Sequence, residues 1–449
     1  MKNFALLCAA LGLAALAVPA AAQYHCFYGN LHAHTSYSDG IGTPDSAYAY
    51  AKNVAHVDVE ALTEHNNGQS YTESAAHFQN EKLVADSMTI PGVFVALAGI
   101  EIGSEGSAGF GHINVWEPSA LSPYFNTAGS LPDCYQWIAD QGVPAQFNHP
   151  GASYDNIFNH LYYYPEFDQT MSLIEVYNSV ASPCVFEDKM LLALQKGWRL
   201  GVSASQDNHH GHWGDQTMSG SSNIPLTGIW ADTLTKRSVL DALLARRTFA
   251  ELTAAGDRIQ LSLAADGHWM GDRYVRTAGK IELVADGRSQ LSNFVRLDLY
   301  SDGDLIDSMS ANSTVVSWRP QQDVDVGSHY FMVKATQASG GVAWSSPVFV
   351  EVPSKGIDQK VATWPTPVTD GARIVFFPLS GVSSIKVSIY NLAGTRIWQT
   401  TSSDPAAAIL WDGRDQRGNL AANGIYYILV EQSNASQTTI SKGKTMVSR

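Results

Sequence analysis

Between residues 27 and 250 the sequence alternates short apolar runs with segments long enough to form helices. The predicted strands are 28–32, 57–63, 93–100, 144–148, 172–176, 199–203 and 226–231. The predicted helices are 45–52, 134–140, 185–196 and 237–246. Such alternation is typical of βα units arranged around a parallel sheet or barrel, and it constrains the first half of the chain more than any other feature.

The pattern changes after Gly256, where period-two and apolar runs follow one another without helical segments. These runs lie at 259–263, 280–285, 295–301, 314–318, 330–335 and 348–352 and are separated by Gly, Asp and Ser turns. Such a pattern is typical of an all-β sandwich. The sequence therefore predicts a multidomain chain, with a βα domain at 23–255, a β-sandwich at 256–352, a linker at 353–361 and a second all-β domain at 362–449.

The first 22 residues have the features of a secretory signal peptide. Lys2 precedes an apolar run from residue 4 to 18, and three consecutive alanines ending at Ala22 form an A-x-A cleavage pattern. The run is too short for a comfortable membrane span and has no stop-transfer flank. We therefore expect cleavage after Ala22, no transmembrane span, and a secreted or surface location (the periplasm or outer surface of a bacterium).

Charge and cysteine content argue against two kinds of function. The formal charge of −14 and the absence of a basic cluster argue against a nucleic-acid-binding surface. After cleavage three cysteines remain, Cys26, Cys134 and Cys184, which allow at most one disulfide, and the sequence does not choose the pair. None lies in a CxxC motif, so a zinc site built from thiolates is not indicated.

Imidazole and carboxylate side chains recur at the C-terminal ends of the predicted strands, where barrel active sites are built. They are His32, His34, Asp39, His65, Glu101, His112, His149, Glu175, Asp207 and His209. Buried without partners, so many polar groups would oppose folding, and divalent cations would remove that cost. Nitrogen and oxygen ligands without thiolate indicate Zn, Mn or Fe, and a carboxylate among several imidazoles suits a bridge between two metal ions.

The order of these groups resembles the PHP (polymerase and histidinol phosphatase) family. Its first motif, HxH followed by S-D-G, is matched by residues 31–40 (LHAHTSYSDG). The second, usually T-D-H, is present as T-E-H at 63–65, and the third as Gly-Ile-Glu ending at Glu101. The fourth, usually S-D-x-H, is present at 205–209 with one inserted residue (SQDNH). Four motifs in the right order form a specific match.

This resemblance implies a distorted (βα)7 TIM-like barrel that uses two or three divalent metal ions to hydrolyse phosphoesters. It implies a first metal held by His32, His34, Glu101 and Asp207. It implies that Glu101 bridges to a second metal that also binds His149, and that Asp39, His65 and His209 hold a third or complete the second. His112 would be a ligand or a substrate contact, and Glu101, Asp207 and His149 would form the catalytic centre. Glu175 would orient a ligand, whereas His210 and His212 would lie in a solvated loop.

The last segment resembles the flagellar-hook-capping-type Ig-like module that also serves as a type IX secretion sorting domain. The matching residues are 387–394 (VSIYNLAG), 411–419 (WDGRDQRGN) and 423–427 (NGIYY). The resemblance implies sorting by a secretion machinery or attachment to the cell surface. The alternative for this segment is a sandwich with a purely structural role.

Together these features predict an exported, metal-dependent hydrolase of a small-molecule ester, most simply a phosphoesterase that uses a metal-bridging hydroxide. A carbaryl-hydrolase-like enzyme, which cleaves ester, amide or carbamate bonds at the same type of site, is one alternative. A non-catalytic, metal-stabilised surface adhesin is another. An amidohydrolase would need a bridging lysine near the fourth strand, but no lysine lies between Lys82 and Lys189.

Overall fold

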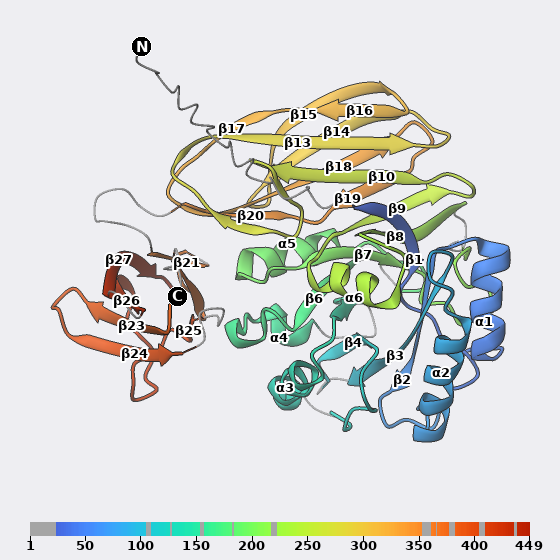
Figure 1. The fold of residues 1–449 in the computed structure, drawn as a ribbon, viewed down its shortest axis with the longest axis horizontal. Coiled ribbons are helices and arrows are strands. Elements are labelled where there is room, and N and C mark those ends of the chain that lie inside the picture. Colours follow the sequence, from blue (N-terminus) through green and yellow to red (C-terminus); the bar gives the residue numbers. More distant parts are fainter. Residues whose placement is uncertain are drawn as a thin grey trace, which may run out of the picture.

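The structure is a computed structural model of a strand-rich, multidomain protein (Figure 1). It describes residues 24–104, 109–125, 128–152, 157–181, 184–216, 222–352, 361–364, 366–376, 382–403, 409–434 and 438–449. The predicted signal peptide and nearly all of the predicted linker lie outside the described residues, so both stay predictions. The domain boundaries at 255/256 and 361/362 likewise remain predictions.

The first half of the chain contributes nine strands of one sheet, in the order β9-β8-β1-β2-β3-β4-β5-β6-β7. They are β1 (His25–Asn30), β2 (Val59–Asn66), β3 (Val95–Ser104), β4 (Gly111–Trp116), β5 (Ala145–Asn148), β6 (Met171–Asn178), β7 (Gly201–Ser205), β8 (Asn223–Ala231) and β9 (Thr248–Ala254). β1–β3 and β5–β7 run parallel, β4 is antiparallel to both of its neighbours, and β8 is antiparallel to β1. All seven predicted strands are present, but β4 and β9 were not predicted, and the sheet is mixed rather than purely parallel.

The segments that follow β1 and β7 lie side by side. The backbone N–H of His34 donates to the carbonyl of Asn208 (2.8 Å), and that of Asp207 donates to the carbonyl of His32 (3.0 Å). Ala33 and Asn208 form an isolated parallel bridge. The segments that carry the HxH and D-x-H motifs are therefore joined directly by backbone hydrogen bonds.

Helices pack against the outer side of these strands (Figure 1). They are α1 (Pro44–Tyr50), α2 (Ala75–Met88), α3 (Leu131–Gln141), α4 (Phe158–Leu161), α5 (Glu187–Lys196) and α6 (Lys236–Leu244). The four predicted helices match α1, α3, α5 and α6 to within a few residues, whereas α2 and α4 were not predicted. α2 begins at Ser74, whose hydroxyl accepts a hydrogen bond from the backbone N–H of His77 (3.1 Å), and it packs against β3.

The middle of the chain is a β-sandwich, as predicted. Its strands are β10 (Ile259–Ala265), β11 (His268–Trp269), β12 (Arg273–Val275), β13 (Gly279–Ser289), β14 (Phe294–Ser301), β15 (Asp304–Ser313), β16 (Val315–Trp318), β17 (Gln321–Val324), β18 (Gly327–Gln337), β19 (Val342–Ser345) and β20 (Val348–Val352). Buried Leu261, Leu283 and Val333 lie in the core of the sandwich. β19 pairs with β9, and Trp344 is buried in the core of the first half, so the two domains share a sheet and part of a core.

The C-terminal strands form a separate lobe with two small sheets (Figure 1). They are β21 (Val361–Trp364), β22 (Ala372–Phe376), β23 (Ser384–Asn391), β24 (Arg396–Ser402), β25 (Ile409–Trp411), β26 (Gly424–Ser433) and β27 (Thr438–Val447). One sheet is β21-β22-β25 and the other is β24-β23-β26-β27. Val387, Ile389, Trp411 and Val430 are buried in the core of this lobe.

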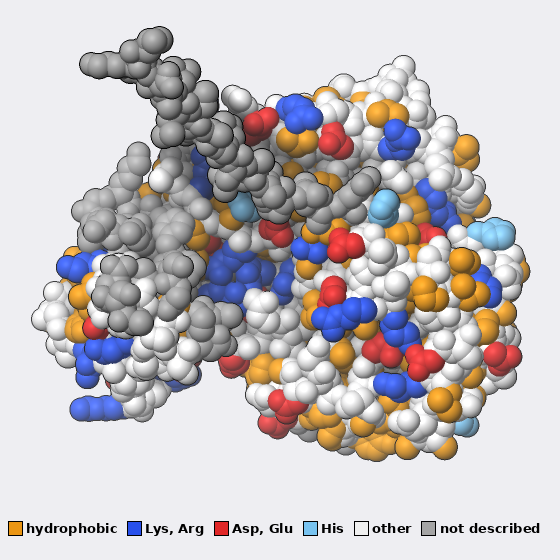
Figure 2. Space-filling view, viewed as in Figure 1, with side chains coloured by type: hydrophobic (Ala, Val, Ile, Leu, Met, Phe, Trp, Pro, Cys, Tyr) orange, Lys and Arg blue, Asp and Glu red, His pale blue; other side chains and the backbone are white. Residues whose placement is uncertain are grey.

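A buried ion pair connects this lobe to the first half of the chain. Nη2 of Arg373 lies 3.1 Å from Oδ2 of Asp168, which also accepts a hydrogen bond from Nε of Arg199 (2.7 Å). Burial alone would raise the pKa of Asp168, but the two guanidinium groups hold it below its ordinary value. Figure 2 shows Lys and Arg side chains gathered in the hollow between the C-terminal lobe and the rest of the molecule.

Among the described residues, Cys26, Cys134 and Cys184 form no disulfide, so none of the three pairings left open by the sequence is present. Within the described ranges, no helix combines the length and the apolar character that crossing a membrane requires.

Candidate metal centre

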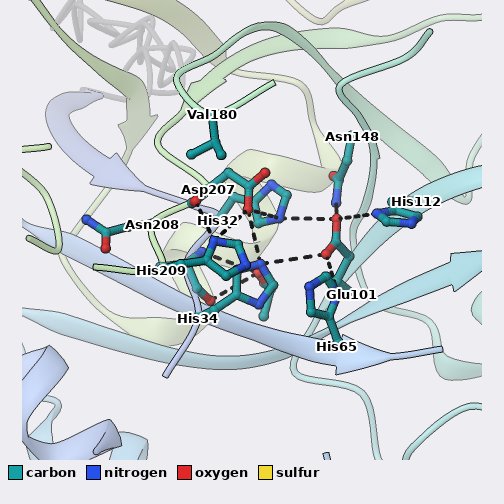
Figure 3. Close-up of polar contacts among 12 residues, drawn as sticks. His32, His34, His65, Glu101, His112, Asn148, Val180, Asp207, Asn208 and His209 are labelled. Atoms are coloured by element: carbon teal, nitrogen blue, oxygen red, sulfur yellow. Dashed lines mark hydrogen bonds and ion pairs between the residues drawn. The ribbon is translucent and has the colours of Figure 1, made fainter. Parts of the chain in front are cut away.

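The nine predicted metal ligands converge at one end of the first-half sheet, around a pocket of about 330 Å³ (Figure 3). His32 and His34 follow β1, Asp39 lies in the next loop, His65 is on β2, Glu101 on β3, His112 on β4, His149 follows β5, and Asp207 and His209 follow β7. The carboxyl ends of parallel strands meet at the same edge of a sheet, so side chains far apart in sequence are brought together here.

Glu101 lies at the centre of this cluster and is buried. Its carboxylate oxygens approach five imidazoles: Nδ1 of His65 (2.9 Å), Nε2 of His32 (3.2 Å), Nδ1 of His112 (3.3 Å), Nε2 of His149 (3.3 Å) and Nε2 of His34 (3.6 Å). Asn148 also donates from Nδ2 to Oε1 (2.8 Å). Burial alone would raise the pKa of Glu101, but the imidazoles of His32 and His112 hold it well below its ordinary value.

Asp207 is the second buried carboxylate of the cluster. Its Oδ1 lies 3.2 Å from Nε2 of His34 and 3.4 Å from Nε2 of His32. Burial would raise its pKa, but these imidazoles hold it well below the ordinary value. Asp207 has a φ of 52° and His149 a φ of 24°, a left-handed backbone that is strained for residues other than glycine. Strain of this kind is retained only where surrounding contacts fix the conformation.

Asp39 forms a second, more exposed group at the mouth of the pocket. Its Oδ1 lies 3.2 Å from Nε2 of His209 and 3.5 Å from Nε2 of His65. The ring of His34 lies beside those of His209 and His65, with centroids 4.2 Å and 4.4 Å away. Burial, followed by the charges of His209 and His65, lowers the pKa of His34 to about 3, so its imidazole is neutral.

The donor atoms fall into three groups that could each hold a metal ion. They are His34, Asp39, His65 and His209; then His32, Glu101 and His149; then His32, His34 and Asp207. In each group the donor atoms lie within 4.8 Å of one another. The carboxylate-to-imidazole contacts within the groups are 3.2–3.5 Å, close to the separation of about 3.3–3.6 Å between tetrahedral ligands of a zinc-type ion. Nε2 of His32 and of His34 are buried and make no hydrogen bond within the described part of the chain. The residues present therefore fit divalent cations.

His32 shows why a cation suits this site. Its Nδ1 lies 3.0 Å from Oε1 of Glu175, an acceptor, so Nδ1 carries a proton and Nε2 faces Glu101 and Asp207. Burial alone would lower the pKa of His32, but the nearby carboxylates raise it well above its ordinary value. A positive charge is thus stabilised beside Nε2, and a metal ion would supply it in place of a proton.

Glu175 supports two predicted ligands from behind. Besides contacting His32, its carboxylate accepts hydrogen bonds from the backbone N–H of His149 (2.7 Å), from Nε2 of Gln146 (3.2 Å) and from Nδ2 of Asn178 (3.1 Å). Both oxygens are fully engaged and the side chain is buried. This geometry matches the orienting role expected for Glu175, because carboxylate–histidine contacts fix the ring and tautomer of metal-binding imidazoles.

Glu64 has a supporting position that the sequence did not reveal. Its Oε1 accepts hydrogen bonds from the backbone N–H (2.8 Å) and the hydroxyl (2.6 Å) of Thr35, and its Oε2 accepts one from the hydroxyl of Ser38. Burial raises its pKa to about 7. The carboxylate thereby fixes the loop that carries Asp39. The only available signal was its place beside His65 in the second motif.

His210 and His212 lie outside the cluster, as expected for a solvated loop. Both are exposed, and Nδ1 of His212 contacts the hydroxyl of Tyr50 (3.2 Å) rather than a predicted ligand. Sequence reasoning also missed three residues at the pocket: Asn178, Tyr71 and Val180.

The two ends of the chain are similar to different known proteins. Residues 365–436 match the family model of the FlgD Ig-like domain. This match covers the residues on which the C-terminal resemblance was based and confirms it. No curated protein matches the chain.

Among solved structures, the chain is similar to a two-domain protein from Bacteroides vulgatus that contains a predicted PHP-like metal-dependent phosphoesterase. The two are 18% identical, the match covers 72% of this chain and 95% of the other, and the TM-score is 0.41. Two proteins of Porphyromonas gingivalis are also similar over shorter stretches. Dimeric latent PorU is 13% identical over 50% of this chain and 24% of its own (TM-score 0.17). PorZ, a surface component of the type-IX secretion system, is 19% identical over 26% of this chain and 15% of its own (TM-score 0.16).

We expect Glu175→Gln to weaken metal affinity about 10–100-fold, because the uncharged amide no longer fixes the tautomer of His32. The affinity can be measured by titrating the protein against a chelating dye with Zn²⁺ or Mn²⁺. Glu282→Gln, at an exposed position of β13, is the matched control and should bind metal like the wild type. Unchanged affinity in Glu175→Gln would show that Glu175 does not support the ligands.

Proposed function

We propose that this protein is an exported, metal-dependent hydrolase built on a distorted (βα)7 barrel. Among hydrolases, we propose a phosphoesterase first. The observation that carries the proposal is the convergence of five imidazoles on the buried carboxylate of Glu101, with Asp207 and Asp39 close by. The backbone bonds between the ends of β1 and β7 support the barrel. So does the parallel direction of β1–β3 and β5–β7.

Glu101 would be the residue that holds two ions together, because its two oxygens face different imidazoles. Oε1 faces His32, His112 and His149, whereas Oε2 faces His65 and His34. Zn, Mn or Fe fits a set of nitrogen and oxygen donors without thiolate. Bound in pairs, such ions polarise the scissile group and lower the pKa of a bound water.

The protein's own residues position the reaction. Glu175 holds the ring of His32 and the backbone of His149, and Glu64 holds the loop of Asp39, so ligands from separate strands keep fixed relative positions. Of the three carboxylates Glu101, Asp207 and Asp39, the last is the most exposed. Its side of the cluster is the side from which a substrate would enter. Fixed donors of this kind need little reorganisation during reaction, which is a large part of how such sites accelerate hydrolysis.

The full chain should hydrolyse at least one member of a panel of phosphomonoesters, phosphodiesters, carboxyl esters and carbamates. Activity should disappear after removal of metal by a chelator and return on addition of Zn²⁺, Mn²⁺ or Fe²⁺. The preferred bond distinguishes a phosphoesterase from a carbaryl-hydrolase-like enzyme. A protein that binds metal at full occupancy but turns over no member of the panel would instead be a metal-stabilised adhesin.

We also propose that the C-terminal lobe serves sorting or surface attachment after export. The match of residues 365–436 to the FlgD Ig-like domain and the separate position of the lobe support this role. All nine predicted ligands precede residue 256, so the lobe adds no ligand to the site.

A chain ending at residue 357 should therefore keep its metal content and turnover but lose its surface location. It should also melt at a lower temperature, because Asp168 loses the buried partner Arg373. Cell fractionation, metal analysis and a thermal melt measure the three properties. A folded, truncated protein without turnover, or one still found at the surface, would contradict the assignment.

A further inference from the structure

An aliphatic side chain lies at the wall of the pocket, directly beside the candidate ligands. Val180 is 44% exposed and lines the pocket together with Asp207 and His149. Figure 3 shows it above Asp207. This half-exposed valine, beside many polar groups, offers an apolar contact to a molecule bound in the pocket.

Val180 is held in place by the cluster itself. Oδ1 of Asn178 accepts hydrogen bonds from the backbone N–H groups of Val180 and Ala181 (3.0 Å each). The amide of the same Asn178 donates to Oε2 of Glu175 (3.1 Å) and to Oδ2 of Asp207 (3.3 Å). One asparagine therefore fixes the turn that presents Val180 and binds the carboxylates beneath it. The hydrogen bonds of Asn178 therefore fix the position of Val180 relative to Asp207.

An aromatic side chain also lines the pocket. The ring of Tyr71 meets the ring of His65 edge-on, with centroids 5.3 Å apart. Nδ2 of Asn67 donates to the hydroxyl of Tyr71 (3.3 Å), which orients the ring. Apart from predicted ligands, the described residues that line the pocket are Tyr71 and Val180.

The pocket lining offers no protein cation for further anionic groups of a substrate. Among the described residues that line the pocket there is no lysine or arginine. Nucleotides and sugar bisphosphates are usually bound by arginine or lysine placed around the reacting group. Metal ions held by the candidate ligands would compensate charge at the reacting group itself, but not on a remote part of the substrate.

We infer that the site acts on an ester whose reacting group carries at most one negative charge and whose remaining group is uncharged and apolar or aromatic. Val180 and Tyr71 contact that group and set the preference. The inference rests on the proposed hydrolase function. In the reaction, water adds across the ester: the bond between the acyl or phosphoryl centre and the bridging oxygen breaks, the OH of water joins that centre, and the remaining proton leaves with the alcohol or phenol.

Two matched pairs of substrates test the preference, each pair differing by one carboxylate far from the reacting bond. One pair is p-nitrophenyl phenyl phosphate and its para-carboxyphenyl counterpart; the other is p-nitrophenyl butyrate and mono-p-nitrophenyl glutarate. We expect the metal-loaded wild type to favour the member without the added carboxylate, in whichever pair it hydrolyses, by about 10-fold or more in kcat/KM.

Val180→Arg should lower that ratio about 10-fold or reverse it, because it removes the apolar contact and places a cation beside the remaining group, where the added carboxylate lies. Val180→Thr, which keeps the shape, should lower turnover of the member without the added carboxylate and leave metal content unchanged. Val185→Arg, an exposed valine outside the pocket lining, is the matched control and should leave the ratio unchanged.

A wild type that treats both members of a pair alike, or favours the one with the added carboxylate, would overturn the inference while leaving the hydrolase proposal intact. A ratio that stays the same in Val180→Arg, Val180→Thr and Val185→Arg would overturn the role of Val180. If the metal-loaded wild type hydrolyses none of the four compounds and no member of the wider panel of phosphomonoesters, phosphodiesters, carboxyl esters and carbamates, the hydrolase proposal fails and the inference fails with it. Hydrolysis confined to phosphomonoesters would overturn the inference alone.

Discussion

Two carboxylates, Glu101 and Asp207, are buried in the same small volume, and their negative charge has to be compensated there. In a medium of low dielectric constant an uncompensated carboxylate is strongly unfavourable, so a fold that buries two of them must bring positive charge to the same place. Five imidazoles surround Glu101, yet His34 is neutral because its neighbours and its burial oppose a further proton. Protons on histidine can therefore supply only part of the compensation, and divalent cations can supply the rest.

The rest of the first half can be understood as the support for this cluster. Hydrogen bonds between the segments after β1 and β7 hold the HxH and D-x-H motifs together. Glu175 and Glu64, both buried, fix ligands and ligand-bearing loops from behind. The left-handed backbone of Asp207 is retained because its N–H is bound by the carbonyl of His32. Asn178 extends the same support outward to Val180, so the shape of the pocket wall is coupled to the geometry of the ligands.

Much of this site could be predicted from the sequence because its chemistry lies in short spacings. The His32 and His34 pair, the T-E-H motif and the D-x-H motif each lie at the end of an apolar run. Because these runs are strands with a common direction, their C-terminal ends meet at one edge of the sheet. What could not be predicted depends on tertiary contacts. β4 alternates polar His112 and Asn114, which face the site, with Ile113 and Val115 in the core, so its sequence lacks an apolar run. α2 buries Glu81 beside its apolar residues, which weakens its helical periodicity.

A bridge of two metal ions by Glu101 is tested most directly by the metal stoichiometry of the purified full chain in its wild-type and Glu101→Gln forms. Glutamine keeps the shape of the side chain, so the change tests charge rather than packing. Without the bridging charge two cations would face each other in a low-dielectric site, where their repulsion is far greater than in water. The account predicts two or three metal equivalents per wild-type chain and one fewer in Glu101→Gln, with nearly all turnover lost. Equal metal content and wild-type activity in Glu101→Gln would contradict it.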